Sequence, residues 1–198
     1  MKILYSPASP YSAKVRMAAR HTGLPVESEI VKTDDQPAVL VDNNPLGKIP
    51  VLLRDDGSAV FDSRAIMQFL DRESGGKLYP NDKDARTTAE VLEALADGIT
   101  DCLIAHVYER RYRPEEKVSQ PWLDRQWEKV SRGLASLEAN PVSFVHGLNG
   151  GHIALAALTG YLDLRFAGQW EQFWPGHAAF VAEFEARFPA YAEFKSKG

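Results

Sequence analysis

The sequence predicts an α/β domain with a mixed sheet, followed by an all-helical domain. In the first part of the chain, short apolar runs and helical patterns occur in the order βαβαββα. Loop-forming glycine, proline and asparagine residues then gather at residues 75–82. Beyond this linker only helical periodicity recurs. We therefore place the first domain at residues 1–79 and the helical domain at residues 86–198.

The first strand, helix and strand are predicted from short local signals. Ile3–Tyr5 is an apolar run that stops at a serine and a proline, as a buried strand does. Pro10–Thr22 carries helix formers, and Gly23 is a typical C-terminal cap. Val26–Val31 alternates in the manner of a second strand.

A loop, a hairpin and a helix complete this domain. The polar stretch Thr33–Asn44 contains a proline and predicts a loop with one helical turn. Pro50–Leu53 and Ser58–Phe61 flank an Asp-Gly pair, which is a strong hairpin signal. Asp62 or Ser63 then caps a helix, whose apolar residues are Ile66, Met67, Phe69 and Leu70.

The helical domain is predicted from four periodic segments. A first long helix is expected to bury Val91, Leu92, Leu95, Ile99 and Cys102. The clearest amphipathic pattern consists of Leu123, Trp127, Val130, Leu134 and Leu137. Residues 153–166 are apolar nearly all round and predict a central buried helix. One last helix carries Phe180, Phe184, Phe188 and Tyr191.

Composition excludes several classes of protein. The 198 residues are 44% hydrophobic and 25% charged, which predicts a sizeable core. A net charge of −4 argues against nucleic-acid binding, and no apolar run approaches the ~20 residues of a membrane span. The amino terminus lacks the apolar core of a signal peptide. The single cysteine, Cys102, cannot form an internal disulfide and fits a reducing cytoplasm. His106 and His152 have no partners at ligand spacing, so we expect no metal site.

Ser9 opens the first helix directly after the first strand. As a local feature it is an N-cap, with Pro10 suited to the first helical turn. The same helix start presents free amides and a positive dipole end, which stabilise an anion such as a thiolate. Ser9 provides no sulfur, but its hydroxyl is able to donate a hydrogen bond to the thiolate of a ligand.

Three motifs resemble those of a known family. Ser9-Pro10-Tyr11-Ser12 is similar to the Cys-Pro-Tyr-Cys motif of glutaredoxins with both cysteines replaced. Residues 44–52 resemble the segment that contains a cis-proline in glutathione S-transferases, and residues 62–66 resemble the acidic-residue-plus-serine helix start of that family. Together they resemble a serine-type bacterial member of this superfamily, of the YibF-like group. The resemblance implies a thioredoxin-like first domain and an all-helical second one.

The resemblance also implies a glutathione site. Ser9 would be the catalytic residue that hydrogen-bonds the glutathione sulfur. Ile49, before a cis Pro50, would pair its backbone with the cysteinyl part, and Lys48 would reach the glycine carboxylate. Asp62 and Ser63 would bind the γ-glutamyl end. Other interpretations are a trans proline opening a strand, an ordinary exposed lysine and simple helix capping.

Further residues are candidates on the same resemblance. Asp97, next to Gly98 in the long helix, would reach glutathione bound by the other subunit of a homodimer; the alternative is a solvated aspartate beside a close-packing glycine. The second substrate would meet Tyr11, Tyr108, Arg111 and Tyr112, although residues 109–113 are also typical of an exposed charged helix end. In the family, a Ser or Thr capping box with Asp opens the central helix. Here Asn149 and His152 stand in its place, which puts that box in doubt.

These observations favour a cytoplasmic glutathione transferase, with glutathione as co-substrate and a detoxifying role. The bound thiolate would attack an electrophilic small molecule or a peroxide. The alternative is a non-catalytic interaction protein with the same architecture. A thiol–disulfide reductase is disfavoured, because Ser9 and Ser12 cannot form a mixed disulfide.

Overall fold

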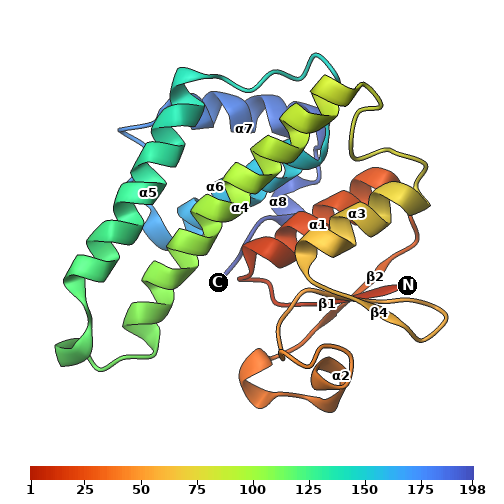
Figure 1. Ribbon diagram of the computed structural model, residues 1–198, viewed down its shortest axis with the longest axis horizontal. Helices are drawn as coiled ribbons and strands as arrows, with labels where there is room; N and C mark the ends of the chain where they lie inside the picture. The colour runs from red at the N-terminus through yellow and green to blue at the C-terminus, as the bar shows by residue number, and fades with distance from the viewer.

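The computed structural model describes residues 1–198 and begins with a four-stranded mixed sheet (Figure 1). The strands lie in the order β2-β1-β3-β4, with β1 parallel to β2 and antiparallel to β3, and β3 antiparallel to β4. Their bounds are Lys2–Tyr5 (β1), Glu27–Ile30 (β2), Val51–Leu53 (β3) and Ala59–Val60 (β4). This thioredoxin-like sheet confirms the predicted fold class.

Helices cover both faces of the sheet. On one face lie α1 (Pro10–Thr22) and α3 (Ser63–Glu73), and on the other lies the short α2 (Ala38–Val41), which follows the 3-10 turn η1 (Thr33–Asp35) (Figure 1). Because successive strand residues point to opposite faces, Ile3 joins the large core and Leu4 a small one. The small core consists of Leu4, Val31, Leu40 and Val51.

The ends of α1 form as predicted. The Ser9 side chain accepts a hydrogen bond from the backbone N–H of Ser12 at 3.1 Å, and Pro10 occupies the first helical position. At the other end, Gly23 has a φ of +74°, and its N–H donates to the Arg20 carbonyl. Glycine adopts this left-handed conformation without the steric cost that a side chain brings.

The rest of the chain is helical. It consists of α4 (Lys83–Arg111), the 3-10 turn η2 (Glu115–Lys117), α5 (Gln120–Ala139), α6 (Gly150–Phe166), α7 (Gly176–Arg187) and α8 (Tyr191–Phe194). Helix α6 is almost wholly buried, as predicted, and packs against α4, α7 and α1. Its contact with α1 joins the helical region to the sheet domain. No helix is both long enough and apolar enough to cross a membrane.

Two sequence predictions for the helical region were wrong. Val91 is 61% exposed, whereas the buried side of α4 carries Ala89, Ile99 and Leu103 together with the acidic Glu93 and Asp97. The predicted last helix is two helices, α7 and α8. Pro189 lies between them, and proline disfavours helical conformation in the preceding residue, here Phe188 with φ −135° and ψ 74°.

The capping box of α6 is present, with a histidine in the place of the usual acid. The Asn149 side chain accepts from the backbone N–H groups of Gly151 and His152, and His152 Nδ1 accepts from the Asn149 N–H at 3.2 Å. His152 Nε2 lies 3.1 Å from the Ser143 carbonyl and donates to it in this arrangement. Burial lowers the pKa of His152 to about 4, so the ring stays neutral, as the box requires.

Candidate functional site

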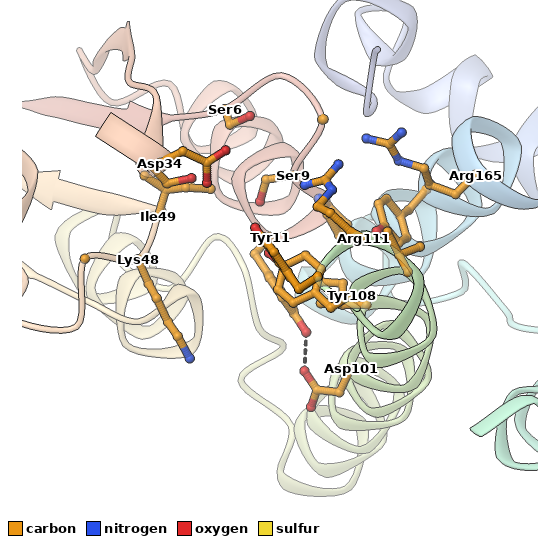
Figure 2. A pocket seen from close by; sticks show the side chains of 18 residues that line it. Ser6, Ser9, Tyr11, Asp34, Lys48, Ile49, Asp101, Tyr108, Arg111 and Arg165 are labelled. Carbon is orange, nitrogen blue, oxygen red and sulfur yellow. Dashed lines mark hydrogen bonds between the residues drawn. The ribbon is translucent and has the colours of Figure 1, made fainter. Parts of the chain in front are cut away.

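A cavity of about 460 Å³ lies between the sheet domain and the helical region (Figure 2). The start of α1 and two loops of the sheet domain form one wall, and α4 and α6 form the other. Seven of the residues that were predicted to form the site line this cavity: Ser9, Tyr11, Lys48, Ile49, Tyr108, Arg111 and Tyr112. The structure therefore brings together seven residues that are distant in sequence. Asp62, Ser63, Pro50 and Asp97 do not line the cavity.

The start of α1 presents unpaired hydrogen-bond donors to the cavity. Ser9 is half-buried, and its Oγ accepts from Ser12, which leaves the hydroxyl proton free to be donated. Pro10 has no N–H, and the N–H of Tyr11 has no backbone partner. A free hydroxyl and a free amide at the positive end of a helix are donors that an anion is able to accept.

The loop before β3 forms the adjoining part of the wall. The Ile49–Pro50 peptide bond is cis, in agreement with the prediction. Ile49 and the exposed Lys48 line the cavity, while Pro50 is buried behind them. The buried Asn44 side chain donates to the Lys48 carbonyl at 2.8 Å and holds the loop in place.

Tyr11 lies at the junction of the two walls. Its hydroxyl donates a hydrogen bond to Asp101 of α4 (Figure 2). Burial, together with this hydrogen bond and the Asp101 charge, raises the pKa of Tyr11 far above its usual value. Tyr11 therefore keeps its proton and contributes a fixed aromatic surface beside Ser9, not a phenolate.

The opposite wall is aromatic and cationic. Tyr108 and Tyr112 are 47% and 61% exposed, so the predicted alternative of an exposed helix end also describes them, yet both line the cavity. Their rings meet edge to face with centroids 5.2 Å apart. Tyr161 and Arg165 of α6 complete this wall.

The start of α3 lies next to the cavity but outside its lining. The exposed Asp62 accepts from the Arg64 N–H at 3.0 Å and caps α3, and Ser63 is buried. The Arg64 guanidinium connects this turn to α4, because its Nε lies 3.2 Å from Asp97 and its Nη2 lies 3.6 Å from Asp101.

Asp97 is buried between the two parts of the molecule. Both of its carboxylate oxygens accept from Lys14 Nζ at 2.8 Å, and Lys14 also donates to Glu93 at 3.0 Å. A Cβ added to Gly98 would meet nothing within 4 Å. The alternative of a solvated aspartate beside a close-packing glycine was therefore wrong. The contact of Asp97 with glutathione of a second subunit stays a prediction.

Sequence reasoning missed several residues of the cavity. Thr33 and Asp34 lie in the segment that was predicted as a polar loop, which gave no functional signal. Tyr161 and Arg165 lie on the apolar α6, which was predicted as core only. A charged residue near the end of an otherwise apolar helix was the one available clue to Arg165. No group of three or more His, Cys, Asp or Glu residues is arranged to hold a metal ion.

Comparisons with known proteins agree with this geometry. Residues 8–73 match the model of the glutathione S-transferase N-terminal domain. Over 171 residues the chain is 33% identical to the uncharacterized GST-like protein YibF of Escherichia coli, with 83% of each sequence covered.

Two solved structures are similar over the whole chain. The glutathione S-transferase of Methylobacillus flagellatus, with glutathione bound, is 35% identical with a TM-score of 0.91 and 99% of each chain covered. A glutathione transferase family member from Pseudomonas fluorescens, with bound S-(propanoic acid)-glutathione, is 35% identical with a TM-score of 0.85 and 100% of each chain covered.

Proposed function

The chain belongs to the glutathione S-transferase family, and from that premise we propose that it is a glutathione transferase. It binds glutathione as co-substrate at the start of α1 and activates the thiol for attack on an electrophilic small molecule or a peroxide. The observation that carries this proposal is the free Ser9 hydroxyl beside the free Tyr11 amide, facing a cavity. The glutathione bound to relatives in crystals supports the same ligand.

Ser9 is the proposed catalytic residue. Its hydroxyl donates a hydrogen bond to the glutathione sulfur, and the helix dipole adds a positive potential at the same place. Both interactions favour the thiolate over the thiol. A helix N-terminus is known to lower thiol pKa values from about 8.5 to as low as ~3.5. The sulfur of bound glutathione is thereby a nucleophile at neutral pH.

The remaining predicted residues hold the rest of the tripeptide. The backbone of Ile49, with Pro50 behind it, pairs with the cysteinyl residue, and Lys48 pairs with the glycine carboxylate. Asp62 and Ser63 bind the γ-glutamyl end at the start of α3, where the Ser63 hydroxyl forms no hydrogen bond within the chain. Asp97 of a second subunit is the proposed additional contact of that end.

The second substrate binds between Tyr11 and the α4 wall of Tyr108, Arg111 and Tyr112. The thiolate forms a sulfur–carbon bond there, and the leaving group departs with its electron pair. The S-(propanoic acid)-glutathione bound to the Pseudomonas relative carries its substituent on sulfur, the atom that this reaction modifies. We further propose that the protein is a cytoplasmic homodimer that acts in detoxification.

The test is the ionisation of bound glutathione. Ser9→Ala removes the hydroxyl, and we expect the pKa of the bound thiol to rise by one unit or more, as measured by the ultraviolet absorbance of the thiolate against pH. Ser12→Ala is the matched control, because this second serine of the motif is buried and its hydroxyl has no partner.

Two results would contradict the proposal. If Ser9→Ala ionises bound glutathione as well as the parent, then Ser9 is not the activating group. If the parent itself is not retained on immobilised glutathione, the chain is better explained as a non-catalytic interaction protein.

A further inference from the structure

Two arginines of the cavity have no acidic partner. Arg111 comes from the end of α4 and Arg165 from the end of α6, and both line the cavity. Neither lies within 4.0 Å of an Asp or Glu oxygen, whereas Arg64, which also borders this region, is paired with Asp97. The Nε of Arg165 is also buried without any hydrogen-bond partner. Both guanidinium groups thus lack a carboxylate partner, and one buried donor, the Nε of Arg165, has no acceptor in the chain.

Neither carboxylate of the cavity forms an ion pair with these arginines. Asp101 is engaged by the Tyr11 hydroxyl and by Arg64. Asp34 is exposed and lies on the opposite wall, beside Ile49, while Arg111 and Arg165 extend from the helical side (Figure 2). The helical wall therefore carries a net positive charge that faces the reacting position at Ser9.

Two tyrosines of the same wall, Tyr108 and Tyr161, are neutral. Burial raises the pKa of Tyr108 and of Tyr161, so both keep their protons at physiological pH. The Arg111 guanidinium carbon lies 5.9 Å from the centroid of the Tyr108 ring. A ligand that fits this wall has a flat apolar part, which packs against the tyrosine rings, and an anionic end, which accepts hydrogen bonds from a guanidinium group.

We infer that the second substrate is an electrophile that carries a carboxylate, which Arg111 and Arg165 bind while its body rests on Tyr108. This inference rests on the proposed transferase function and narrows its substrate class. Arginine is suited to this task because its planar group binds both oxygens of a carboxylate. A bound carboxylate would supply the acceptor that the buried Nε of Arg165 lacks.

An aromatic acid serves as the probe. In 4-chloro-3-nitrobenzoate, the thiolate forms a sulfur–carbon bond at the ring carbon that carries chlorine. The carbon–chlorine bond breaks, chloride leaves with the electron pair, and the thiol proton goes to solvent. The corresponding benzamide has nearly the same shape and no charge. The ratio of kcat/KM for acid over amide, compared between variants, cancels their different intrinsic reactivities.

The variants are Arg165→Met and Arg111→Met, with Arg165→Lys as the conservative change. We expect each methionine variant to lower the acid-over-amide ratio about tenfold or more, as the loss of a hydrogen bond to a charged group does. Arg165→Lys should lose less, because it keeps the charge. Arg132→Met, an exposed position on α5 away from the cavity, should leave the ratio unchanged.

One outcome would overturn the inference directly. If the methionine variants slow acid and amide equally and raise the pKa of the bound glutathione thiol, then the arginines serve the thiolate and not the second substrate. An acid-over-amide ratio that no arginine variant alters would also overturn it.

A binding measurement separates this inference from the transferase proposal. Calorimetry with the two finished glutathione adducts, acid and amide, requires no turnover. Tighter binding of the acid adduct to the parent, lost in Arg165→Met, supports the inference even if transfer to the chloroarenes is undetectable. Equal binding of both adducts overturns it, while failure to bind glutathione itself overturns the proposed function.

Discussion

Helix α1 has two environments of opposite character within little more than one turn. Its start faces the cavity, where the Ser9 hydroxyl and the Tyr11 N–H have no hydrogen-bond acceptor within the chain. Further along, Lys14 is 1% exposed and is paired with both Glu93 and Asp97. The first environment has hydrogen-bond donors without a partner in the chain, while the charges of the second are paired within the chain. The polar groups at the start of α1 are thus available to a ligand, whereas the buried charges further along tie α1 to α4.

The largest effect is expected from breaking the ion pairs of Lys14. Lys14→Met leaves the buried Glu93 without a cation and Asp97 with Arg64 alone, and breaking a buried ion pair in this way typically costs about 3–5 kcal/mol of unfolding free energy. Urea denaturation measures this loss. Lys2→Met removes an exposed ion pair to Glu29 as the control, and we expect little change from it.

A second variant shows whether the buried charges cause that loss. Adding Glu93→Gln and Asp97→Asn to Lys14→Met removes the uncompensated carboxylates and should restore part of the stability. A Lys14→Met protein as stable as the Lys2→Met protein would show that the buried cluster does not hold the two parts together.

The next effect is a dependence of stability on pH, set by His152. Its pKa is about 4 in the folded protein, against 6.5 for an unperturbed histidine. Above pH 6.5 both states are neutral at this residue, and its full contribution is present. Between pH 6.5 and about 4 the unfolded state binds a proton that the folded state does not, so stability falls by about 3 kcal/mol.

His152→Gln tests this dependence without removing the capping box, because glutamine is a usual residue at this position of the box. Thermal unfolding at several pH values should show a flatter profile for the variant over the same range. An unchanged profile would assign the acid sensitivity to other groups.

A smaller effect contrasts two glycines of the helical region. A Cβ at Gly151 would lie 2.6 Å from the Ala89 carbonyl oxygen of α4, so Gly151→Ala forces α4 and α6 apart at a cost of about 1–3 kcal/mol. At Gly98 a Cβ meets nothing, and Gly98→Ala should add up to about 1 kcal/mol of stability. Chemical denaturation should show a lower free energy of unfolding for Gly151→Ala and a higher one for Gly98→Ala. A change in the same direction for both variants would contradict the packing described above.

The smallest change in stability is expected at the start of α1. Ser9→Ala removes an N-cap, at a cost of about 1 kcal/mol. Its loss of thiol activation should be far more visible than its loss of stability. A Ser9→Ala protein that unfolds as readily as Lys14→Met would remove the distinction between the two environments of α1.

Local signals predicted the sheet domain and the two ends of α1 well. The ends of α1 are fixed by Ser9, Pro10 and Gly23 through contacts within one turn. Their roles can therefore be predicted from the residues next to them in the sequence. Glu93 and Asp97 were not predicted as buried, because their partner Lys14 lies far away in the chain and belongs to the other domain.

Arg165 was missed for a related physical reason. Helix α6 is apolar nearly all round, and such a pattern shows that a helix is buried but not which cavity its last turn reaches. His152 was misjudged because the acid of the usual box is only one way to accept the hydrogen bond of the cap. A neutral imidazole accepts it equally well.

The length of α4 has a consequence for how this cavity can be altered. With 29 residues the helix is about 44 Å long, and one continuous rod carries Glu93 and Asp97 at its middle and Arg111 at its end. A small tilt at the middle is therefore magnified at the tip. Substitutions around Lys14 would therefore shift Arg111 and the rest of the α4 wall of the cavity. A change of substrate does not require substitutions in the cavity itself.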